Sequence, residues 1–483
     1  MLCRGEAKVK VEDVLGLKVK YNYEVSGISI DSRKTKKNDI FVCIDGENVS
    51  GNDFIDELIK KKVRTFVTNN IDIYKKYVNE KLNIVLSHDV KKDLGFYCKK
   101  FYENVSQKVH LVGVTGTNGK TTVTTLLYKY YRYLGKSCTL IGTNGIYIND
   151  LYFESLNTTP DIITIYEIMK KSIDNGSYLI IMEVSSQGIK EGRVNGLSFD
   201  VGLLTNITLD HLDYHKTFDD YFYTKVLFLS RCNNVIANRD SNKFLEVNRA
   251  IDKKIITFGK SEADYHINNI DYDIERTSFD LDIYGQNFHI QTSMLGEYNI
   301  YNVTSFIALV DYLGSFNQYT LSYLSKKITI PGRFEIIETN RGKFVIDFAH
   351  TPDGVENVLK LLNTLKAGKL ITVIGMGGNR DKSKRRIVGK ILSENSDIII
   401  LTEDNSRFEE TMDIINEIQE GITENKEKVL IVLNRIEAIK KAYSISSKKD
   451  IVAVLGKGNE NYIIKGDIKL PYSDKEEVYK LGK

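Results

Sequence analysis

Six short apolar runs constrain the fold of this chain more strongly than any other feature. Each is the length of a β-strand, is rich in Ile and Val, and ends in or near a glycine or a carboxylate. Several are followed by stretches of helical periodicity, such as TTVTTLLYKYYRYLG. This alternation predicts βα units and mainly parallel sheets covered on both faces, which bind ligands at the carboxyl ends of their strands. The runs span residues 110–116, 178–184, 343–350, 369–378, 397–405 and 450–458.

The length of the chain predicts three domains, because its 483 residues exceed the usual domain size of about 150 residues roughly threefold. We expect one boundary near residue 105, before the strand that leads into GTNGKTT, and a second near residue 330, before the segment PGR. The chain is therefore expected to form an α/β protein with domains at residues 1–105, 106–330 and 331–483.

The composition excludes several classes of protein. Hydrophobic residues make up 42% and charged residues 27% of the chain, which is typical of a globular protein with a full core. A net charge of +3 leaves no large basic surface for nucleic acid. No apolar window reaches the ~18 residues that a membrane helix needs, and charges interrupt the start MLCRGEAKVKVEDVL, so neither a membrane span nor a signal peptide is expected.

The cysteines indicate a reducing compartment. They are odd in number, widely scattered and without a CxxC pair, so neither a disulfide framework nor a zinc knuckle is expected. We therefore expect a cytoplasmic protein with reduced thiols, with no nucleic-acid partner and no membrane insertion. The five cysteines are Cys3, Cys43, Cys98, Cys138 and Cys232.

The segment GTNGKTT, residues 116–122, has the features of a phosphate-binding loop. It follows a predicted strand and opens a predicted helix, so its backbone N–H groups and the helix N-terminus can surround a phosphate. Lys120 would reach the β- and γ-phosphates, and the Thr121 hydroxyl would bind Mg²⁺. The strict pattern requires glycine at position 114, where this chain has Val114. A surface Gly-Asn turn with an incidental lysine is the alternative, but the order of strand, turn and helix favours a phosphate loop.

Acids and imidazoles gather in two other segments. Glu183 ends a buried strand, where a carboxylate is costly unless it is exposed at the tip or binds a cation. The segment TNITLDHLDYH, residues 205–215, contains two of only seven histidines. A polar loop with capped helix ends would explain this segment alone. Because Mg²⁺ prefers carboxylate oxygen, the segment and the phosphate loop together favour a nucleotide-linked metal site.

These segments, with others in the same order, resemble the Mur ligase family of ATP-dependent amide-forming enzymes. The resemblance covers nearly the whole chain and is closest to the members that add the third amino acid to a peptidoglycan precursor. Its further segments are residues 30–33 and 39–42, then 157–160, Lys225 after DDYFYT, and 296–302, and finally 331–335, 347–353, 377–382 and 456–458.

The resemblance implies a central P-loop-type parallel sheet with an ATP site, a C-terminal Rossmann-like α/β domain and a small N-terminal α/β domain. It implies a monomeric enzyme that uses ATP and Mg²⁺ to join meso-diaminopimelate to UDP-MurNAc-L-Ala-D-Glu through an acyl phosphate. A lysine-adding enzyme, or another Mur-type ligase such as a folylpolyglutamate synthetase, is an alternative. A protein that uses ATP only as a switch is an alternative from another class, against which the intact Glu183, His211 and Lys225 argue.

Carried over position by position, the resemblance also implies catalytic, metal-binding and ATP-binding residues. Lys225 matches the family lysine that reacts with CO₂ to form a carbamate, which converts a cation into an oxygen ligand. The catalytic positions are Lys120, Glu183, His211 and Lys225, and the metal ligands are Thr121, Glu183, His211 and Lys225. The ATP contacts are Gly116, Thr117, Asn118, Gly119, Lys120, Thr121, Thr122, Asn302, Arg333, Asp347 and His350.

Two further sets follow from the resemblance, one for each remaining substrate. The contacts to UDP-MurNAc-dipeptide are Ser32, Asn157, Thr158, Thr159, Ser185 and Arg193. The pocket for the incoming amino acid consists of Arg380, Asp404, Asn405, Ser406, Arg407, Gly456 and Glu460.

Arg407 predicts which amino acid is added. Diaminopimelate differs from lysine by a second carboxylate, which a planar guanidinium can bind bidentately. The diaminopimelate-adding members of the family resemble this chain in having arginine there. The alternative is that Arg407 is a surface residue that starts the helix RFEETMDIINEIQ. Three positions depart from the family pattern: Ser406 replaces proline and Asn459 replaces histidine near the amino-acid pocket, and Gln187 replaces histidine beside the metal region.

Overall fold

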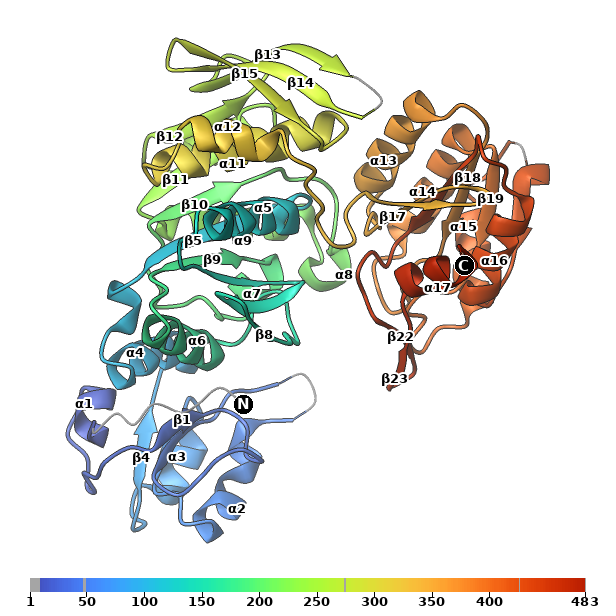
Figure 1. The fold of residues 1–483 in the computed structure, drawn as a ribbon. Helices are drawn as coiled ribbons and strands as arrows, with labels where there is room; N and C mark the ends of the chain where they lie inside the picture. The colour runs from blue at the N-terminus through green and yellow to red at the C-terminus, as the bar shows by residue number, and fades with distance from the viewer. Residues whose placement is uncertain (1–8, 47–48, 273–274, 425, 483) are drawn as a thin grey trace.

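The computed structural model describes residues 9–46, 49–272, 275–424 and 426–482, which form three blocks, each built around a sheet of its own (Figure 1). All six apolar runs form strands and most of their neighbours pair in parallel, which confirms the α/β fold class. In chain order the runs become β5 (His110–Thr115), β9 (Leu179–Glu183), β17 (Gly342–Asp347), β18 (Leu370–Ile374), β19 (Ile398–Leu401) and β21 (Ile451–Leu455).

The N-terminal block is a four-stranded parallel sheet in the order β1-β2-β3-β4. Helix α4 (Val90–Phe101) joins this block to the next, because its buried face shares one apolar cluster with α1 (Val11–Leu15) and α6 (Ile162–Asp174). The other elements are β1 (Gly27–Ser29), β2 (Asp39–Val42), η1 (Gly51–Phe54), α2 (Ile55–Lys60), β3 (Thr65–Thr68), α3 (Ile71–Tyr77), β4 (Asn83–Leu86) and η2 (Val105–Gln107).

The central block contains an eleven-stranded sheet in the order β15-β14-β13-β12-β11-β10-β5-β9-β6-β7-β8. Neighbouring strands from β13 to β6 are parallel, whereas β14 and β15 at one edge and β7 and β8 at the other pair antiparallel. These strands are β6 (Thr139–Gly142), β7 (Gly145–Ile148), β8 (Leu151–Phe153), β10 (Val201–Leu204), β11 (Asn234–Asn238), β12 (Ile255–Gly259), β13 (Tyr265–Tyr272), β14 (Thr277–Ile283) and β15 (Gln286–Thr292).

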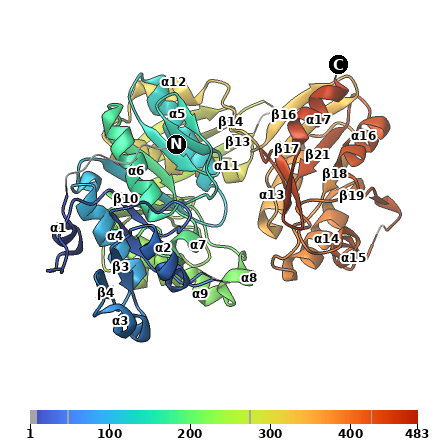
Figure 2. The same cartoon turned by 90° about the horizontal axis from the view of Figure 1, so that it is seen from below.

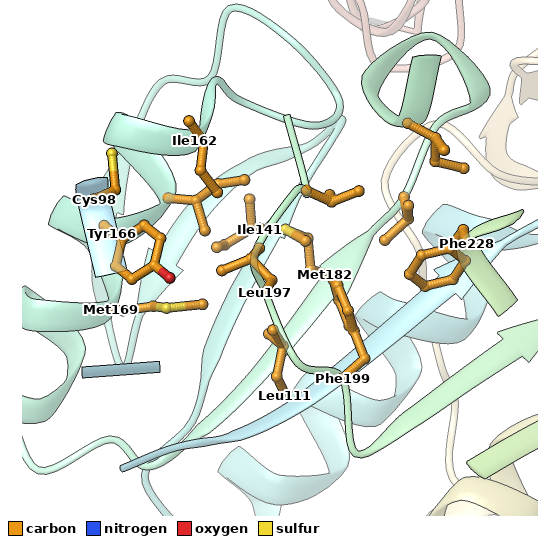
Figure 3. Close-up of a cluster of buried hydrophobic side chains, with 14 of the residues drawn as sticks. Cys98, Leu111, Ile141, Ile162, Tyr166, Met169, Met182, Leu197, Phe199 and Phe228 are labelled. Atoms are coloured by element: carbon orange, nitrogen blue, oxygen red, sulfur yellow. The ribbon is translucent and has the colours of Figure 1, made fainter. Parts of the chain in front are cut away.

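Helices cover both faces of this sheet, as the near-continuous apolar strands require. Successive residues of β5 point to opposite faces: Leu111 belongs to the cluster under α6 and α9, and Val112 to the cluster under α5 and α11. Figure 3 shows part of the first cluster, in which Phe199 and Phe228 meet edge to face. The helices are α5 (Lys120–Tyr133), α7 (Ser186–Lys190), α8 (Leu212–His215), α9 (Phe218–Arg231), α10 (Phe244–Ala250), α11 (Glu297–Tyr312) and α12 (Gln318–Leu324).

The C-terminal block is a six-stranded sheet in the order β16-β17-β21-β18-β19-β20, parallel except for the edge strand β16. Helices α13, α14 and α15 pack on one face, and α16 and α17 on the other. The remaining elements are β16 (Glu335–Thr339), α13 (Pro352–Leu365), α14 (Ser383–Asn395), α15 (Thr411–Gln419), η3 (Lys426–Lys428), β20 (Val429–Ile431), α16 (Arg435–Ile445), the hairpin β22 (Tyr462–Lys465) and β23 (Ile468–Pro471), and α17 (Asp474–Leu481).

Three other expectations bear on the fold. The boundaries near residues 105 and 330 stay predictions, although each falls in a segment between two sheets. Cys3 lies outside the described residues, and among those described the other four cysteines are buried and form no disulfide. No described helix is both long and apolar enough to cross a lipid bilayer.

Candidate active site

A cavity of about 920 Å³ lies where the carboxyl ends of the central strands meet the C-terminal block. Figures 1 and 2 both place α13 and β17 on the side of the C-terminal block that faces the central block. Direct contacts cross this seam: the Asn118 amide donates to the Asp353 carboxylate at 2.9 Å, and the Arg333 guanidinium donates to the Thr121 hydroxyl at 3.1 Å. The C-terminal block therefore closes one wall of the cavity.

The phosphate loop connects β5 to α5, as its sequence predicts. Gly116 and Gly119 have φ values of +147° and +89°, which L side chains rarely adopt. The Lys120 ammonium group folds back over the loop and donates to the carbonyl oxygens of Gly116 and Thr117 at 2.8 and 2.9 Å. Burial lowers the pKa of Lys120 from its ordinary value. A loop held by its own lysine around the N-terminus of a helix is built to bind an anion.

We expect Gly116→Ala to weaken ATP binding by at least about tenfold, because a Cβ there would lie 1.9 Å from the Thr205 hydroxyl oxygen and would push the loop off its support. Gly135→Ala is the matched control: Gly135 also has positive φ, at +69°, but nothing lies within 4 Å of its Cβ position. It should cost about 1 kcal/mol of stability and leave ATP affinity unchanged. Calorimetric titration with ATP checks both variants, and equal affinities would contradict the prediction.

Glu183 ends β9 beneath the phosphate loop and is only 1% exposed. Its Oε2 accepts hydrogen bonds from the hydroxyls of Thr121 and Thr143 at 2.9 and 3.1 Å, and its Oε1 accepts from the Thr143 amide at 2.9 Å. Among the described residues there is no group of three or more His, Cys, Asp or Glu side chains arranged to hold a metal. The donors present are instead one carboxylate with hydroxyls beside a phosphate loop, a set that fits Mg²⁺ bound together with nucleotide phosphates.

Lys225 lies on α9 behind the phosphate loop and does not line the cavity. The residue is 1% exposed, and its amine donates to the Gly116 carbonyl oxygen at 3.0 Å and lies 4.5 Å from the centre of the Tyr221 ring. Burial, and then the nearby Lys120 cation, hold the pKa of Lys225 well below its ordinary value. A buried amine of this kind is available in its neutral, nucleophilic form.

His211 precedes α8 and has a left-handed backbone, with φ of +54°. Burial lowers the pKa of its imidazole to about 4, so the ring is neutral at neutral pH. Its partner is Asp210, whose carboxylate lies 3.3 Å from Nε2. Burial raises the pKa of Asp210, but His211, His350 and Lys384 together hold it far below its ordinary value. The sequence prediction did not select Asp210; an acid directly before an imidazole in the loop that follows β10 (Val201–Leu204) was the available signal.

Four of the predicted ATP contacts line the cavity, Asn302 from α11 of the central block and Arg333, Asp347 and His350 from the C-terminal block. The Asp347 carboxylate accepts from the backbone amides of Phe334 and Ala349 at 2.6 and 2.7 Å. The Arg333 guanidinium lies 4.4 Å from the Phe348 ring centre. These contacts fix the loop after β17.

The predicted amino-acid pocket is also assembled, apart from Ser406, which is buried beside it. Lys457, which the sequence prediction omitted, is fully buried there and lies 2.8 Å from the Glu460 carboxylate and 3.5 Å from that of Asp404. The Asn405 amide donates to Glu460 at 2.9 Å. The lining residues of this set are Arg380, Asp404, Asn405, Arg407, Gly456 and Glu460.

The predicted sugar-nucleotide contacts are only partly brought together. Asn157, Thr158, Ser185 and Arg193 line the cavity. Thr159 lies just behind them, where its carbonyl oxygen accepts from the Arg193 guanidinium at 2.8 Å. Ser32 belongs to the N-terminal block and does not line this cavity. Its predicted role therefore requires a ligand that extends beyond the cavity.

Three family models match the chain in order: Mur ligase family, catalytic domain, over residues 24–103; Mur ligase middle domain, over 114–310; and Mur ligase, glutamate ligase domain, over 332–458. The chain is 37% identical to UDP-N-acetylmuramoyl-L-alanyl-D-glutamate--2,6-diaminopimelate ligase 1 of Clostridium acetobutylicum, with 97% of this chain and 98% of that protein covered. It is also 37% identical to the ligase of that name from Aquifex aeolicus, with 94% and 93% covered.

Solved structures agree with these relatives. A structure of UDP-N-acetylmuramoyl-L-alanyl-D-glutamate--2,6-diaminopimelate ligase matches with a TM-score of 0.69 and 26% identity over 98% of both chains. The MurF ligase of Thermotoga maritima in complex with ADP matches with a TM-score of 0.63 over 94% of this chain and 96% of that one, and at 19% identity it supports the fold alone. With a phosphate loop, a buried carboxylate and a shared cavity already in place, these matches show that the chain belongs to the Mur ligase family of ATP-dependent amide-forming enzymes.

Proposed function

We propose that this ligase joins meso-2,6-diaminopimelate to UDP-MurNAc-L-Ala-D-Glu and uses ATP as the source of energy. We further propose that it works in the cytoplasm as a monomer. The names of the relatives support this substrate pair. The structural observation that carries the proposal is Arg407, a cation that lines the cavity without a carboxylate partner. Among the described residues, none of the Asp or Glu side chains lies within 4.0 Å of its guanidinium nitrogens.

The Arg407 side chain is positioned rather than mobile. Its Nη1 donates to the carbonyl oxygens of Gly378 and Asn405 at 2.9 and 3.1 Å. Its backbone is tied to the β22–β23 hairpin, because its amide donates to Ile464 and its carbonyl oxygen accepts from Gly466. These bonds hold the left-handed φ of +52° without the proline that the family pattern has at position 406. The guanidinium is thus held in place but has no carboxylate partner among the described residues, so it can bind a carboxylate of the substrate.

Acidic groups lie close enough to complement the ammonium ends of diaminopimelate. Asp404 and Glu460 line the same cavity as Arg407, and the fully buried Lys457 balances part of their charge. A ligand with two ammonium groups and two carboxylates matches this mixture of fixed charges better than lysine, which has only one carboxylate. An unpaired cation in a partly desolvated pocket disfavours a ligand that ends in an ammonium group.

The remaining site residues suit transfer of the γ-phosphoryl group of ATP to the D-glutamyl side-chain carboxylate. Lys120 would neutralise charge that develops on the β- and γ-phosphate oxygens, and the loop amides would hold those oxygens in place. Thr121, Glu183, His211 and a carbamate on Lys225 would hold Mg²⁺, which when bound supplies charge neutralisation for the transferring phosphoryl group. The amine of diaminopimelate then attacks the acyl phosphate, and phosphate leaves. The contacts between the two blocks would keep water from this intermediate.

A screen of amino acids tests the proposal. With UDP-MurNAc-L-Ala-D-Glu and ATP, we expect kcat/KM for meso-diaminopimelate to exceed that for lysine by about 10³-fold, because mispairing a buried charge costs several kcal/mol. Arg407→Ala should lower kcat/KM for diaminopimelate by at least about 10²-fold. Arg386→Ala, which removes an exposed arginine of α14 paired with Glu420, should leave the value unchanged. Phosphate release and mass spectrometry of the product measure both.

The same screen separates the alternatives. A kcat/KM for lysine equal to or above that for diaminopimelate would make the chain a lysine-adding enzyme. Ligation of glutamate to a folate would make it a folylpolyglutamate synthetase. ATP hydrolysis that no precursor or amino acid stimulates would favour a nucleotide switch.

A further inference from the structure

The Asp210 carboxylate lies at the seam between the central and C-terminal blocks and holds His211 from two sides. Its Oδ1 accepts from the His211 backbone amide at 2.9 Å, and its Oδ2 lies 3.3 Å from Nε2 of the ring. His211 has a left-handed backbone, a conformation that non-glycine residues keep only when their surroundings stabilise it. Asp210 thus contacts both the backbone and the ring of His211.

Two side chains of the C-terminal block reach the same carboxylate. Lys384, at the first turn of α14, brings Nζ to 3.5 Å from Oδ1 of Asp210, and His350 brings Nε2 to 4.0 Å from Oδ2. The Asp210 side chain is 4% exposed and that of Lys384 14%. A second pair, Arg380 with Asp213 at 3.4 Å, crosses the seam beside the first.

The burial of this ion pair makes it sensitive to docking. A buried carboxylate is unfavourable unless a cation compensates it, and removing one partner of a buried pair costs far more than removing one at the surface. Lys384 belongs to the C-terminal block, so it can compensate Asp210 only when that block is docked. The facing groups on this carboxylate are His211 from its own segment and His350 and Lys384 from across the seam.

We propose that Lys384 is a positioning residue: through its ion pair with Asp210 it fixes the His211 imidazole, so that the phosphoryl-transfer site is complete only when the C-terminal block is docked. In this proposal Lys384 acts through Asp210 and does not touch a reacting atom. The kinetic part of the test rests on the proposed ligase function, whereas its spectroscopic part needs no substrate.

The kinetic test is a double-mutant cycle. Lys384→Met should lower kcat for ADP release about tenfold while KM for ATP changes less than about twofold, and Lys384→Arg should restore most of the loss. Asp210→Asn should lower kcat further, and adding Lys384→Met to it should then change kcat less than about twofold. If Lys384→Met costs the same tenfold in both backgrounds, the lysine acts directly on substrate and the proposal is wrong. Lys390→Met is the matched control, since Lys390 is an exposed residue of α14 whose Nζ lies 3.8 Å from the Glu394 carboxylate.

The spectroscopic test follows the His211 ring itself in the full chain, with labelled histidine and a His211→Gln variant to assign its resonance among the seven histidines. Lys384→Met should shift this resonance in the absence of substrates, and Lys390→Met should not. Thermal unfolding verifies that each variant is folded, and Lys384→Gln serves if the methionine variant is not. An unshifted His211 resonance would overturn the proposal even if the ligase assay succeeded, whereas a shifted resonance in a chain without ligase activity would overturn only the proposed function.

Discussion

Lys120→Ala is expected to reduce kcat at least about 10³-fold, the largest loss of any single substitution in the phosphate loop. The lysine contributes twice: its cation is the only one that the loop itself carries, and its two bonds to the Gly116 and Thr117 carbonyls hold the loop closed. Alanine removes both contributions. ADP release measured at saturating ATP and Mg²⁺ gives the change in kcat.

Two further variants separate the contributions. Lys120→Arg keeps the charge, but a planar guanidinium cannot fold into the same two-carbonyl contact, so it should remain severely impaired. Lys136→Ala, an exposed lysine just beyond α5, should leave kcat unchanged. Activity of Lys120→Ala within about tenfold of wild type would refute the assignment of this segment as the phosphate loop.

The parallel core of the fold could be predicted because its information is local. Each apolar run needs burial on both faces, and several are followed by helical stretches, so the parallel direction of the strands follows from the chain. The antiparallel edges could not be predicted in this way. Strand β14 alternates buried and half-exposed residues, a pattern that depends on pairing with β13 and β15 rather than on its own composition.

The same distinction between local and long-range information applies to the candidate active site. The phosphate loop is predictable because strand, loop and helix lie within one segment. The pairs of Asp210 with Lys384 and of Asn118 with Asp353 join residues that are 174 and 235 positions apart, and their contact depends on how two blocks dock. Lys457 was missed for a related reason: in sequence it is one lysine among many, and only its burial beside Asp404 and Glu460 distinguishes it.

Lys225→Ala is expected to lower kcat at least about 10³-fold, because it would remove a negative oxygen ligand and not a positive charge. The amine is buried and donates to the Gly116 carbonyl oxygen, and no carboxylate of the described residues lies within 4.0 Å of it. An amine held neutral by burial can attack the carbon of CO₂ and release a proton, which leaves a carbamate with one negative charge. That charge would compensate the cations that surround the phosphate loop.

Rescue by a small acid distinguishes a carbamate from an ordinary buried lysine. Formate or acetate should restore part of the activity of Lys225→Ala, because the cavity left by the side chain admits a carboxylate at the vacated position. Lys225→Arg should be equally inactive but should not respond to the added acid, since the guanidinium fills that space and cannot react with CO₂.

Mild mass spectrometry of wild-type protein should find the added mass of one CO₂ on the peptide that contains Lys225. Full activity of Lys225→Ala without added acid, or an unmodified amine in fully active enzyme, would exclude the carbamate and leave Lys225 as a structural residue behind the loop.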